Sequence, residues 1–292
     1  MLAELRDLVA RHADGDYRGT AIAGVTVMAS DTPTRPLVGV TEPTFALVVQ
    51  GAKRTVLGDT LFDYGAGQYL IALVELPVTA HVVSASPRQP FLAFGLKLRP
   101  SAIATLVLQA ADLRGPATEP GLAVSNAAPD LLDPAVRLLR LLDRPCDIPV
   151  LAASIEREIL WRLLNGEQGA MVRQVGLADS RLSQIARAIR QIRGHYSELL
   201  RIGDLADEAR MSVTTFHRHF RAITTMSPLQ YQKQIRLQEA RTRLMAQPDD
   251  VAAVGFAVGY ESPSQFSREY RRLFGAPPRQ DAARLRALTT AV

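Results

Sequence analysis

The fold of this 292-residue chain is decided by a repeat: SVTTFHRHFR, residues 212–221, and SPSQFSREYR, residues 262–271. The two stretches align without gaps at an offset of fifty residues, and Phe220 matches Tyr270. The identical pairs are Ser212 and Ser262, Phe216 and Phe266, Arg218 and Arg268, and Arg221 and Arg271. Self-similarity of this kind predicts that the chain builds one supersecondary unit twice.

Each copy of the repeat has the pattern of an amphipathic helix that begins at a capping serine. The apolar face of the first copy consists of Val213, Phe216, Phe220 and Ile223. The opposite face carries Thr214, His217, Arg218 and Arg221. In the second copy the inward residues are Phe266, Tyr270 and Leu273, and the outward residues are Ser264, Gln265, Arg268 and Arg272. Both helices therefore bury one side and present polar groups on the other.

A short apolar helix precedes each copy, in IGDLADEARM (202–211) and DDVAAVGFAVGY (249–260). A supporting helix, a tight turn and a polar-faced helix form a helix-turn-helix unit, whose second helix enters the DNA major groove. Between the units, Ser227 and Pro228 suit the start of a helix over 228–245. Its expected length of about 27 Å approaches the roughly 34 Å between successive major-groove faces. We expect a strut that holds two reading helices in adjacent grooves.

The basic residues are concentrated at the C-terminal end. Residues 183–292 carry a net charge of +7, whereas residues 1–182 carry −2. Of the 17 basic residues in the C-terminal part, only Lys233 is a lysine. The guanidinium group suits contacts with phosphate and guanine. A genome rich in G and C would also raise the arginine content, and composition alone leaves both explanations open.

The N-terminal part has a different texture. Between residues 20 and 98, apolar runs such as FALVVQG and QYLIALVEL alternate with turn-rich pieces, which predicts a β-sandwich or barrel. Helices are expected over residues 1–15, 100–111, 134–142 and 148–164, with a linker around 170–181. The expected architecture is α+β. It comprises a β-domain (1–100), a helical coupling and dimerisation segment with the linker (101–181), and an all-α domain of two helix-turn-helix units joined by a long helix (182–292).

Composition limits the class of protein. The chain is 47% apolar and 22% charged, with a mean hydropathy of +0.03, which suits a globular protein with an ample core. No run of eighteen apolar residues is present, so we expect no membrane partner. The N-terminus lacks the basic start and the unbroken apolar stretch of a secretory signal. A cytoplasmic location is therefore expected.

The sequence shows none of the common catalytic motifs, such as GxSxG, a P-loop or HExxH. Metal-dependent cupins gather two or three histidines with a carboxylate. The strand region holds only His81, which we expect to be structural or a pocket polar group. The lone Cys146 excludes an intramolecular disulfide and a multi-Cys zinc site. We expect no enzyme, metal or cofactor, with a catalytic cupin bearing a DNA-binding tail as the distant alternative.

Residues 211–246 and the characteristic VGYESPSQFSREYRRLFGAPPRQ, residues 258–280, resemble the AraC/XylS family of bacterial regulators. Residues 42–78 and the piece SASPRQPFLAFGLKL resemble the cupin-like β-barrel domain of one subgroup of that family. The resemblance continues through IEREILWRLLNGEQG and so covers nearly the whole chain. One departure is Gly255, where such proteins usually carry alanine. It should cost roughly 1 kcal/mol of helix stability.

The resemblance, with the outward faces, implies a sequence-specific DNA-binding transcription regulator on double-stranded promoter DNA. The expected base-edge contacts are Thr214, His217, Arg218, Ser264, Gln265 and Arg268. The expected phosphate contacts are Arg221, Lys233, Arg271 and Arg272. His219 is expected to face the surface of its own domain.

The family resemblance also implies that the β-domain binds a small effector or only supplies a dimer interface. Candidate residues at the mouth of an effector pocket are Gln50, Lys53, Tyr64 and Gln68, with ordinary barrel-edge polar groups as the alternative. The leucine-rich helices at 134–142 and 148–164 would pair with a second subunit or cover the barrel. Family resemblance favours a homodimer, activation over repression, and RNA polymerase as a further partner.

Overall fold

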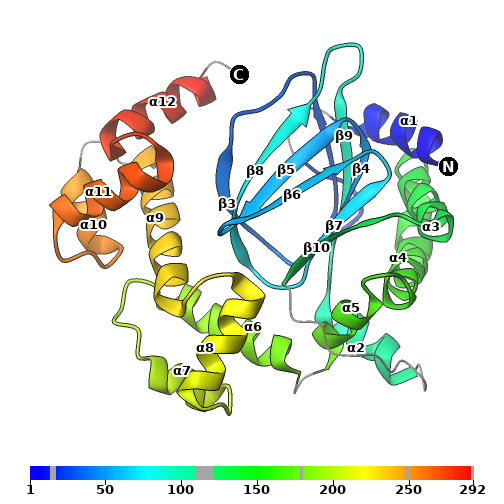
Figure 1. The fold of residues 1–292 in the computed structure, drawn as a ribbon. Coiled ribbons are helices and arrows are strands. Elements are labelled where there is room, and N and C mark those ends of the chain that lie inside the picture. Colours follow the sequence, from blue (N-terminus) through cyan, green and yellow to red (C-terminus); the bar gives the residue numbers. More distant parts are fainter. Residues whose placement is uncertain (14–17, 110–120, 178–179, 247–249, 291–292) are drawn as a thin grey trace.

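The computed structural model describes residues 1–13, 18–109, 121–177, 180–246 and 250–290 (Figure 1). The helices of the N-terminal part are α1 (Leu2–His12), α2 (Pro100–Gln109), α3 (Pro129–Arg140), α4 (Ile148–Asn165) and α5 (Gly169–Gly176), with short 3-10 turns η1 (Leu141–Asp143) and η2 (Pro145–Asp147). Its strands are β1 (Arg18–Gly19), β2 (Val25–Ser30), β3 (Leu37–Thr41), β4 (Thr44–Gln50), β5 (Ala52–Leu57), β6 (Thr60–Gly65), β7 (Gln68–Ala72), β8 (Leu76–Ser84), β9 (Phe91–Lys97) and β10 (Leu122–Asn126).

The C-terminal part is all-α in the described residues. Its helices are α6 (Arg181–Gly194), α7 (Ile202–Glu208), α8 (Val213–Thr224), α9 (Pro228–Ala246), α10 (Val251–Ala257), α11 (Pro263–Phe274) and α12 (Pro278–Thr290). The predicted α+β class, with strands first and two helix-turn-helix units joined by a long helix, is confirmed.

The strands form two antiparallel sheets that enclose a common interior. One has the order β1-β2-β9-β4-β7-β10 and the other β3-β8-β5-β6. Because the two sheets are not hydrogen-bonded to each other in the described residues, the expected barrel is a two-layer sandwich. β10 pairs with β7 over five residues, so one strand lies within the range expected to be helical, beyond residue 100.

Helices cover the outer side of the six-stranded sheet (Figure 1). α1 buries Leu5, Leu8 and Val9 against β2, β4 and β9. α3 packs on α1 and α4, and its leucines are buried within this chain, as are those at the end of α4. The buried leucines of α3 and α4 thus pack among the helices beside the sandwich, and pairing with a second subunit stays a prediction.

One expectation about a helix start is wrong. α3 begins at Pro129, so Pro134 lies inside the helix rather than in its first turn. The stretch 165–180, interpreted as short and polar with a weak helix inside, contains α5, so a linker around residues 170–181 has a helix within it and stays a prediction. The ring of Pro134 points to the buried side, where its lost hydrogen bond is compensated by packing.

Two hydrophobic cores divide the molecule unequally. The larger core runs from the sandwich into the first helix-turn-helix unit, where it includes Phe216, Phe220 and Tyr231. The second unit has a separate core around Phe266 and Tyr270. The first unit is thus packed as a continuation of the N-terminal part, whereas α9 carries the second.

Polar contacts join the two parts of the chain along the same boundary. The Tyr231 hydroxyl donates to the backbone oxygen of Glu75 at 2.9 Å, and the Glu75 carboxylate pairs with Arg193 on α6. Farther along α9, Gln238 Nε2 donates to the backbone oxygen of Gly39 on β3 at 3.2 Å. β3 therefore lies beside the strut helix (Figure 1).

Candidate nucleic-acid interface

The first helix-turn-helix unit consists of α7, a turn and α8. Ser212 caps α8, because its Oγ accepts a hydrogen bond from the Thr215 N–H at 3.3 Å. Phe216 and Phe220 are fully buried, which fixes the orientation of α8 about its own axis. The turn places Arg210 in the left-handed region, with φ of 53°, a conformation that is uncommon for a residue with a side chain.

The outward face of α8 is open to solvent. Thr214, His217, Arg218 and Arg221 are all exposed. Arg218 reaches toward the neighbouring His219 ring, with 3.4 Å between Nη2 and Nε2. His219 itself is 3% exposed, so it lies in the interior rather than on the surface of its domain as expected. No acidic residue occurs in α8, and its exposed face is therefore uniformly neutral or cationic.

The second unit repeats this construction with α10 and α11. Ser262 Oγ accepts a hydrogen bond from the Gln265 N–H at 3.4 Å, and Phe266 and Tyr270 are fully buried. Its turn uses Gly259 at φ 93°, where an added Cβ would lie 2.3 Å from the Ser197 oxygen. Because backbone lies that close, only glycine fits this turn without a local shift.

The departure at Gly255 has a structural reason. A Cβ at this position would lie 3.0 Å from the ring of Phe266, the residue that anchors α11. The glycine lets α10 approach the reading helix closely. The helix propensity lost at this position is the cost of that approach.

The outward face of α11 divides into free and engaged residues. Ser264, Arg268, Arg271 and Arg272 are exposed, and Arg268 Nε donates to the backbone oxygen of Ser264 at 3.4 Å, which leaves the Ser264 hydroxyl outside that bond. Gln265 is only partly exposed, and its amide donates to Glu269 at 3.3 Å. Of the base-edge residues predicted on α11, Gln265 is therefore the one already held within the protein.

Glu269 is the centre of a small polar cluster that sequence reasoning missed. Its carboxylate accepts from Lys233 Nζ at 2.9 Å and from the Tyr260 hydroxyl at 2.9 Å. Burial disfavours the charged form, but the bonds from Lys233, Tyr260 and Gln265 outweigh it and lower the pKa of Glu269. Lys233, predicted to contact phosphate, is thus ion-paired with Glu269 although its side chain is 45% exposed, unlike the arginines of α11.

The strut helix α9 spans nineteen residues, or about 28 Å. One end contacts the first unit, where the rings of Tyr231 and Phe220 lie 5.7 Å apart. In its middle, Arg236 donates to the backbone oxygens of Tyr196, Glu198 and Gly259. Its guanidinium therefore connects the loop before the first unit to the turn of the second.

The far end of α9 is anchored by a buried carboxylate. Asp281 on α12 is 0% exposed and accepts from Arg241 Nε at 2.8 Å, Arg284 Nη2 at 2.6 Å and the Tyr270 hydroxyl at 3.0 Å. Arg241 also lies over the Phe274 ring, 4.5 Å from its centroid. These contacts fix α11 and α12 to the strut.

A cavity of about 660 Å³ lies between the two sheets. Lys53 and Tyr64, both predicted pocket residues, line it, together with His81 and Thr55. The Tyr64 hydroxyl and Thr55 Oγ1 are 3.2 Å apart, and His81 Nδ1 is buried with no hydrogen-bond partner among the described residues. Alternation along β5 places Lys53 and Thr55 on the same inward face, a signal that could have identified Thr55 from the sequence.

The other two predicted pocket residues lie outside the cavity lining. Gln50 Nε2 donates to the Pro90 oxygen at 2.8 Å. Gln68 accepts from the Gly65 N–H at 3.0 Å and donates to Asn126 at 3.2 Å. Both amides therefore make hydrogen bonds at the ends of their strands, and their role at a pocket mouth stays a prediction.

Two general findings concern the described residues. No three His, Cys, Asp or Glu side chains among them gather in a way that could hold a metal ion. None of the described helices has the length and apolar character needed to cross a lipid bilayer.

The chain is similar to transcriptional regulators in sequence and in fold. It is 33% identical over 88 residues to the HTH-type transcriptional activator RhaS of Pectobacterium atrosepticum, covering 30% of this chain and 32% of RhaS. It is 26% identical over 144 residues to the HTH-type transcriptional regulator ArgR of Pseudomonas aeruginosa, covering 49% of this chain and 44% of ArgR. The chain thus spans about a third to under half of the length of these relatives.

Similarity over the whole fold is seen with ToxT of Vibrio cholerae in complex with (E)-4-(8-methylnaphthalen-1-yl)but-3-enoic acid. The TM-score is 0.58 at 9% identity, covering 91% of this chain and 98% of ToxT. A helix-turn-helix domain model matches residues 205–284. The model of the AraC-type transcriptional regulator N-terminus matches residues 21–171, more than half of the chain. The chain therefore belongs to the family of AraC-type transcriptional regulators.

Proposed function

We propose that the protein is a sequence-specific regulator that binds promoter DNA by placing α8 and α11 in two successive segments of the major groove. The single observation that supports this most is the equivalence of Arg218 and Arg268. Each is exposed on a helix that is capped by serine and anchored by a buried phenylalanine, and both helices are attached to one strut. Such arginines contact guanine through two hydrogen bonds.

The remaining contacts follow from exposure. Thr214, His217 and Ser264 lie on the same outward faces and reach base edges, and Gln265 does so after releasing Glu269. Arg221, Arg271 and Arg272 bind the flanking phosphates. Lys233 joins them only when its pair with Glu269 opens, so its contribution to affinity is the smallest of the four.

Genome-wide footprinting of the purified protein identifies the sites, and a binding assay then tests the two arginines. Arg218→Ala and Arg268→Ala should each lose about 1–3 kcal/mol of binding and relax the preference at different base pairs. Arg144→Ala, an exposed arginine on the N-terminal part, is the matched control and should bind normally. Unchanged affinity and unchanged preference in both variants would contradict the proposal.

The sandwich cavity is the proposed site of a small-molecule effector. Its lining is mainly apolar, with Lys53, Tyr64 and the unpartnered Nδ1 of His81 as polar groups that fix orientation. The ToxT structure with a bound carboxylic acid makes an effector a reasonable expectation for this fold. Because β3 lines the cavity and also contacts α9, a ligand that prefers one position of β3 shifts the reading units.

Thermal unfolding across a metabolite panel tests the effector. At least one compound should stabilise the wild-type protein, and Lys53→Ala and His81→Ala should lose that stabilisation. Lys97→Ala, an exposed lysine outside the cavity, is the control. No stabilisation by any compound favours the rival function, a regulator whose N-terminal domain only dimerises. Stoichiometric iron or zinc in the purified protein would instead favour an enzyme.

We further propose a homodimer formed through the exposed apolar side of α4, where Val150 is 73%, Leu151 44% and Trp161 38% exposed. Light scattering should give twice the monomer mass, and Val150→Asp with Leu151→Asp should give the monomer. Leu61→Asp, at a leucine on β6 that is 52% exposed, should leave the mass unchanged. A reporter placed behind a footprinted promoter tests activation and, with purified RNA polymerase, recruitment.

A further inference from the structure

The loop between α6 and α7, residues 195–201, lies against both helix-turn-helix units. The ring of Tyr196 packs on the core that contains the first unit and also on the separate core of the second unit. Its hydroxyl accepts a hydrogen bond from Arg243 Nη2, near the end of α9, at 2.8 Å. The backbone oxygen of Ser197 lies so close to Gly259 that an added Cβ there would be 2.3 Å away. A segment that precedes the first unit thus contacts the turn of the second.

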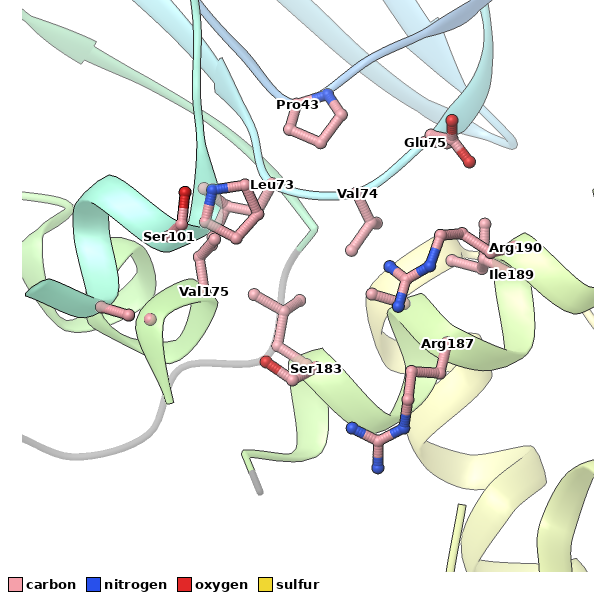
Figure 2. A pocket seen from close by; sticks show the side chains of 15 residues that line it. Pro43, Leu73, Val74, Glu75, Ser101, Val175, Ser183, Arg187, Ile189 and Arg190 are labelled. Carbon is pink, nitrogen blue, oxygen red and sulfur yellow. The ribbon is translucent and has the colours of Figure 1, made fainter. Parts of the chain in front are cut away.

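The position of this loop depends mainly on the DNA-binding part. The loop follows α6, which packs on α5 and on three helices of the DNA-binding part, α7, α8 and α9. Toward the sandwich, α6 borders a cavity of about 400 Å³, with Pro43, Leu73 and Val74 on the sandwich side and Arg187 and Arg190 on the α6 side (Figure 2). Because this cavity separates α6 from the β7–β8 connection, we treat α6 and its loop as a part of the first unit.

Arg236, in the middle of α9, bonds this loop and the second unit with one side chain. Its Nε donates to the backbone oxygen of Tyr196 at 2.6 Å and its Nη2 to that of Glu198 at 2.8 Å, both in the loop. Its Nη1 donates to the Gly259 oxygen, in the turn of the second unit, at 2.8 Å. Gln232, one turn earlier, also donates to the Tyr196 and Glu198 oxygens, at 3.1 and 2.8 Å. Because a guanidinium presents its donors in a rigid plane, the three bonds define where loop and turn lie relative to α9.

Hydrophobic packing alone defines the angle between the two units only weakly. The first unit packs on the start of α9 around Tyr231, whereas Leu244, near the end of α9, belongs to the core of the second unit. Because the two cores are separate, a small rotation of one unit about α9 leaves the apolar surface of each core buried. Such a rotation moves the Gly259 oxygen away from Arg236, and a hydrogen bond weakens steeply as its geometry departs from the optimum.

We infer that Arg236 is a positioning residue that sets the angle between α8 and α11, and that it thereby restricts the protein to one spacing of the two half-sites. The inference rests on the proposed binding of α8 and α11 to successive segments of the major groove. Arg236 acts through the backbone that it holds. One extra base pair between the half-sites rotates the second half-site by roughly 35° and moves it by about 3.4 Å. A rigid pair of reading helices cannot follow that displacement, whereas a loosened pair can.

The test uses the full-length protein and a duplex from a footprinted site. Fluorescence anisotropy measures the affinity for this duplex, for the same duplex with one base pair inserted between its half-sites, and for duplexes with either half-site scrambled. The insertion should weaken binding by the wild-type protein about tenfold. Arg236→Lys keeps the charge but lacks the planar set of donors, so the insertion should weaken its binding by less than about threefold. Its affinity for the duplexes with a single half-site should stay at the wild-type value.

Two further variants complete the experiment. Gln234→Met, on the same helix, is the matched control and should show the wild-type insertion penalty. Tyr196→Phe removes only the hydroxyl that accepts from Arg243, so it should reduce the penalty by a smaller factor than Arg236→Lys does. Tyr196→Phe also decides the outcome if Arg236→Lys does not fold.

A wild-type insertion penalty in both Arg236→Lys and Tyr196→Phe overturns the inference. Equal weakening on every duplex, including those with a single half-site, also overturns it, because that result indicates a general loss of stability. Failure of the proposed function gives a different result: the wild-type protein would then lose no affinity when either half-site is scrambled.

Discussion

Substituting Asp281 tests whether the buried charge cluster holds the second reading unit on the strut. The carboxylate is 0% exposed and pairs with Arg241, whose side chain is 14% exposed. Asp281→Ala leaves that cation nearly buried without a partner, and it also removes the acceptor of the Tyr270 hydroxyl. Breaking a buried pair from one side costs about 3–5 kcal/mol. The same substitution at the exposed Asp207 should stay within about 0.5 kcal/mol.

The loss of stability in Asp281→Ala should be confined to the second unit, because this unit has its own hydrophobic core. Hydrogen exchange at pH 7 should show amides of α11 and α12 losing protection in Asp281→Ala, with α8 and the sandwich unchanged. A double-mutant cycle with Arg241→Met isolates the pair, and we expect a coupling of at least about 2 kcal/mol. A cost below about 1 kcal/mol, or an equal loss of protection in α8, would refute this reasoning.

Three further predictions concern the second unit. Gly259→Ala should lower its unfolding free energy by several kcal/mol in urea melts, because the new Cβ would meet the Ser197 oxygen at 2.3 Å in a left-handed backbone; a loss under 1 kcal/mol contradicts this account. Gly255→Ala should lower the free energy of unfolding in the same urea melts by about 1 kcal/mol, because overpacking against Phe266 exceeds the gain in helix propensity. A higher free energy of unfolding would show that the Phe266 ring moves to make room. The lowered pKa of Glu269 means that its stabilisation is full above pH 4.5 and lost as pH falls through that lowered pKa. Glu269→Gln should therefore flatten the acid limb of a stability–pH curve, and an unchanged limb would exclude this role.

The repeat was predictable because its signals are local. A serine cap, an apolar stripe and a turn are read within about a dozen residues, so the two units and the strut were located from sequence alone. β10 was missed because its five residues are too few to show alternation and its pairing with β7 spans some fifty residues of chain. Strand propensity within a short stretch gives no information about a pairing strand that lies so far away in the sequence.

The hydrogen-bond and ion-pair partners of individual side chains could not be predicted from the sequence either. Lys233 and Gln265 have the residue types of DNA contacts, but both meet Glu269, and only the crossing of α9 and α11 brings these groups together. Gln50 and Gln68 likewise have the residue types of pocket groups, but they are hydrogen-bonded at the ends of β4 and β7. The arginines on the outward faces of α8 and α11 are exposed, whereas these four residues are only partly exposed, and this difference is not visible in their residue types.

Because the two reading units belong to different hydrophobic cores, a movement of α9 displaces the second unit farther than the first. The first reading unit is packed with the sandwich, while the second lies at the end of a helix about 28 Å long. A tilt of that helix by about 5° would displace its far end by roughly 2.5 Å, which approaches the spacing of about 3.4 Å between stacked base pairs. In the proposed mode of binding, a small shift of β3 against the middle of α9 would therefore be enlarged at the second reading unit.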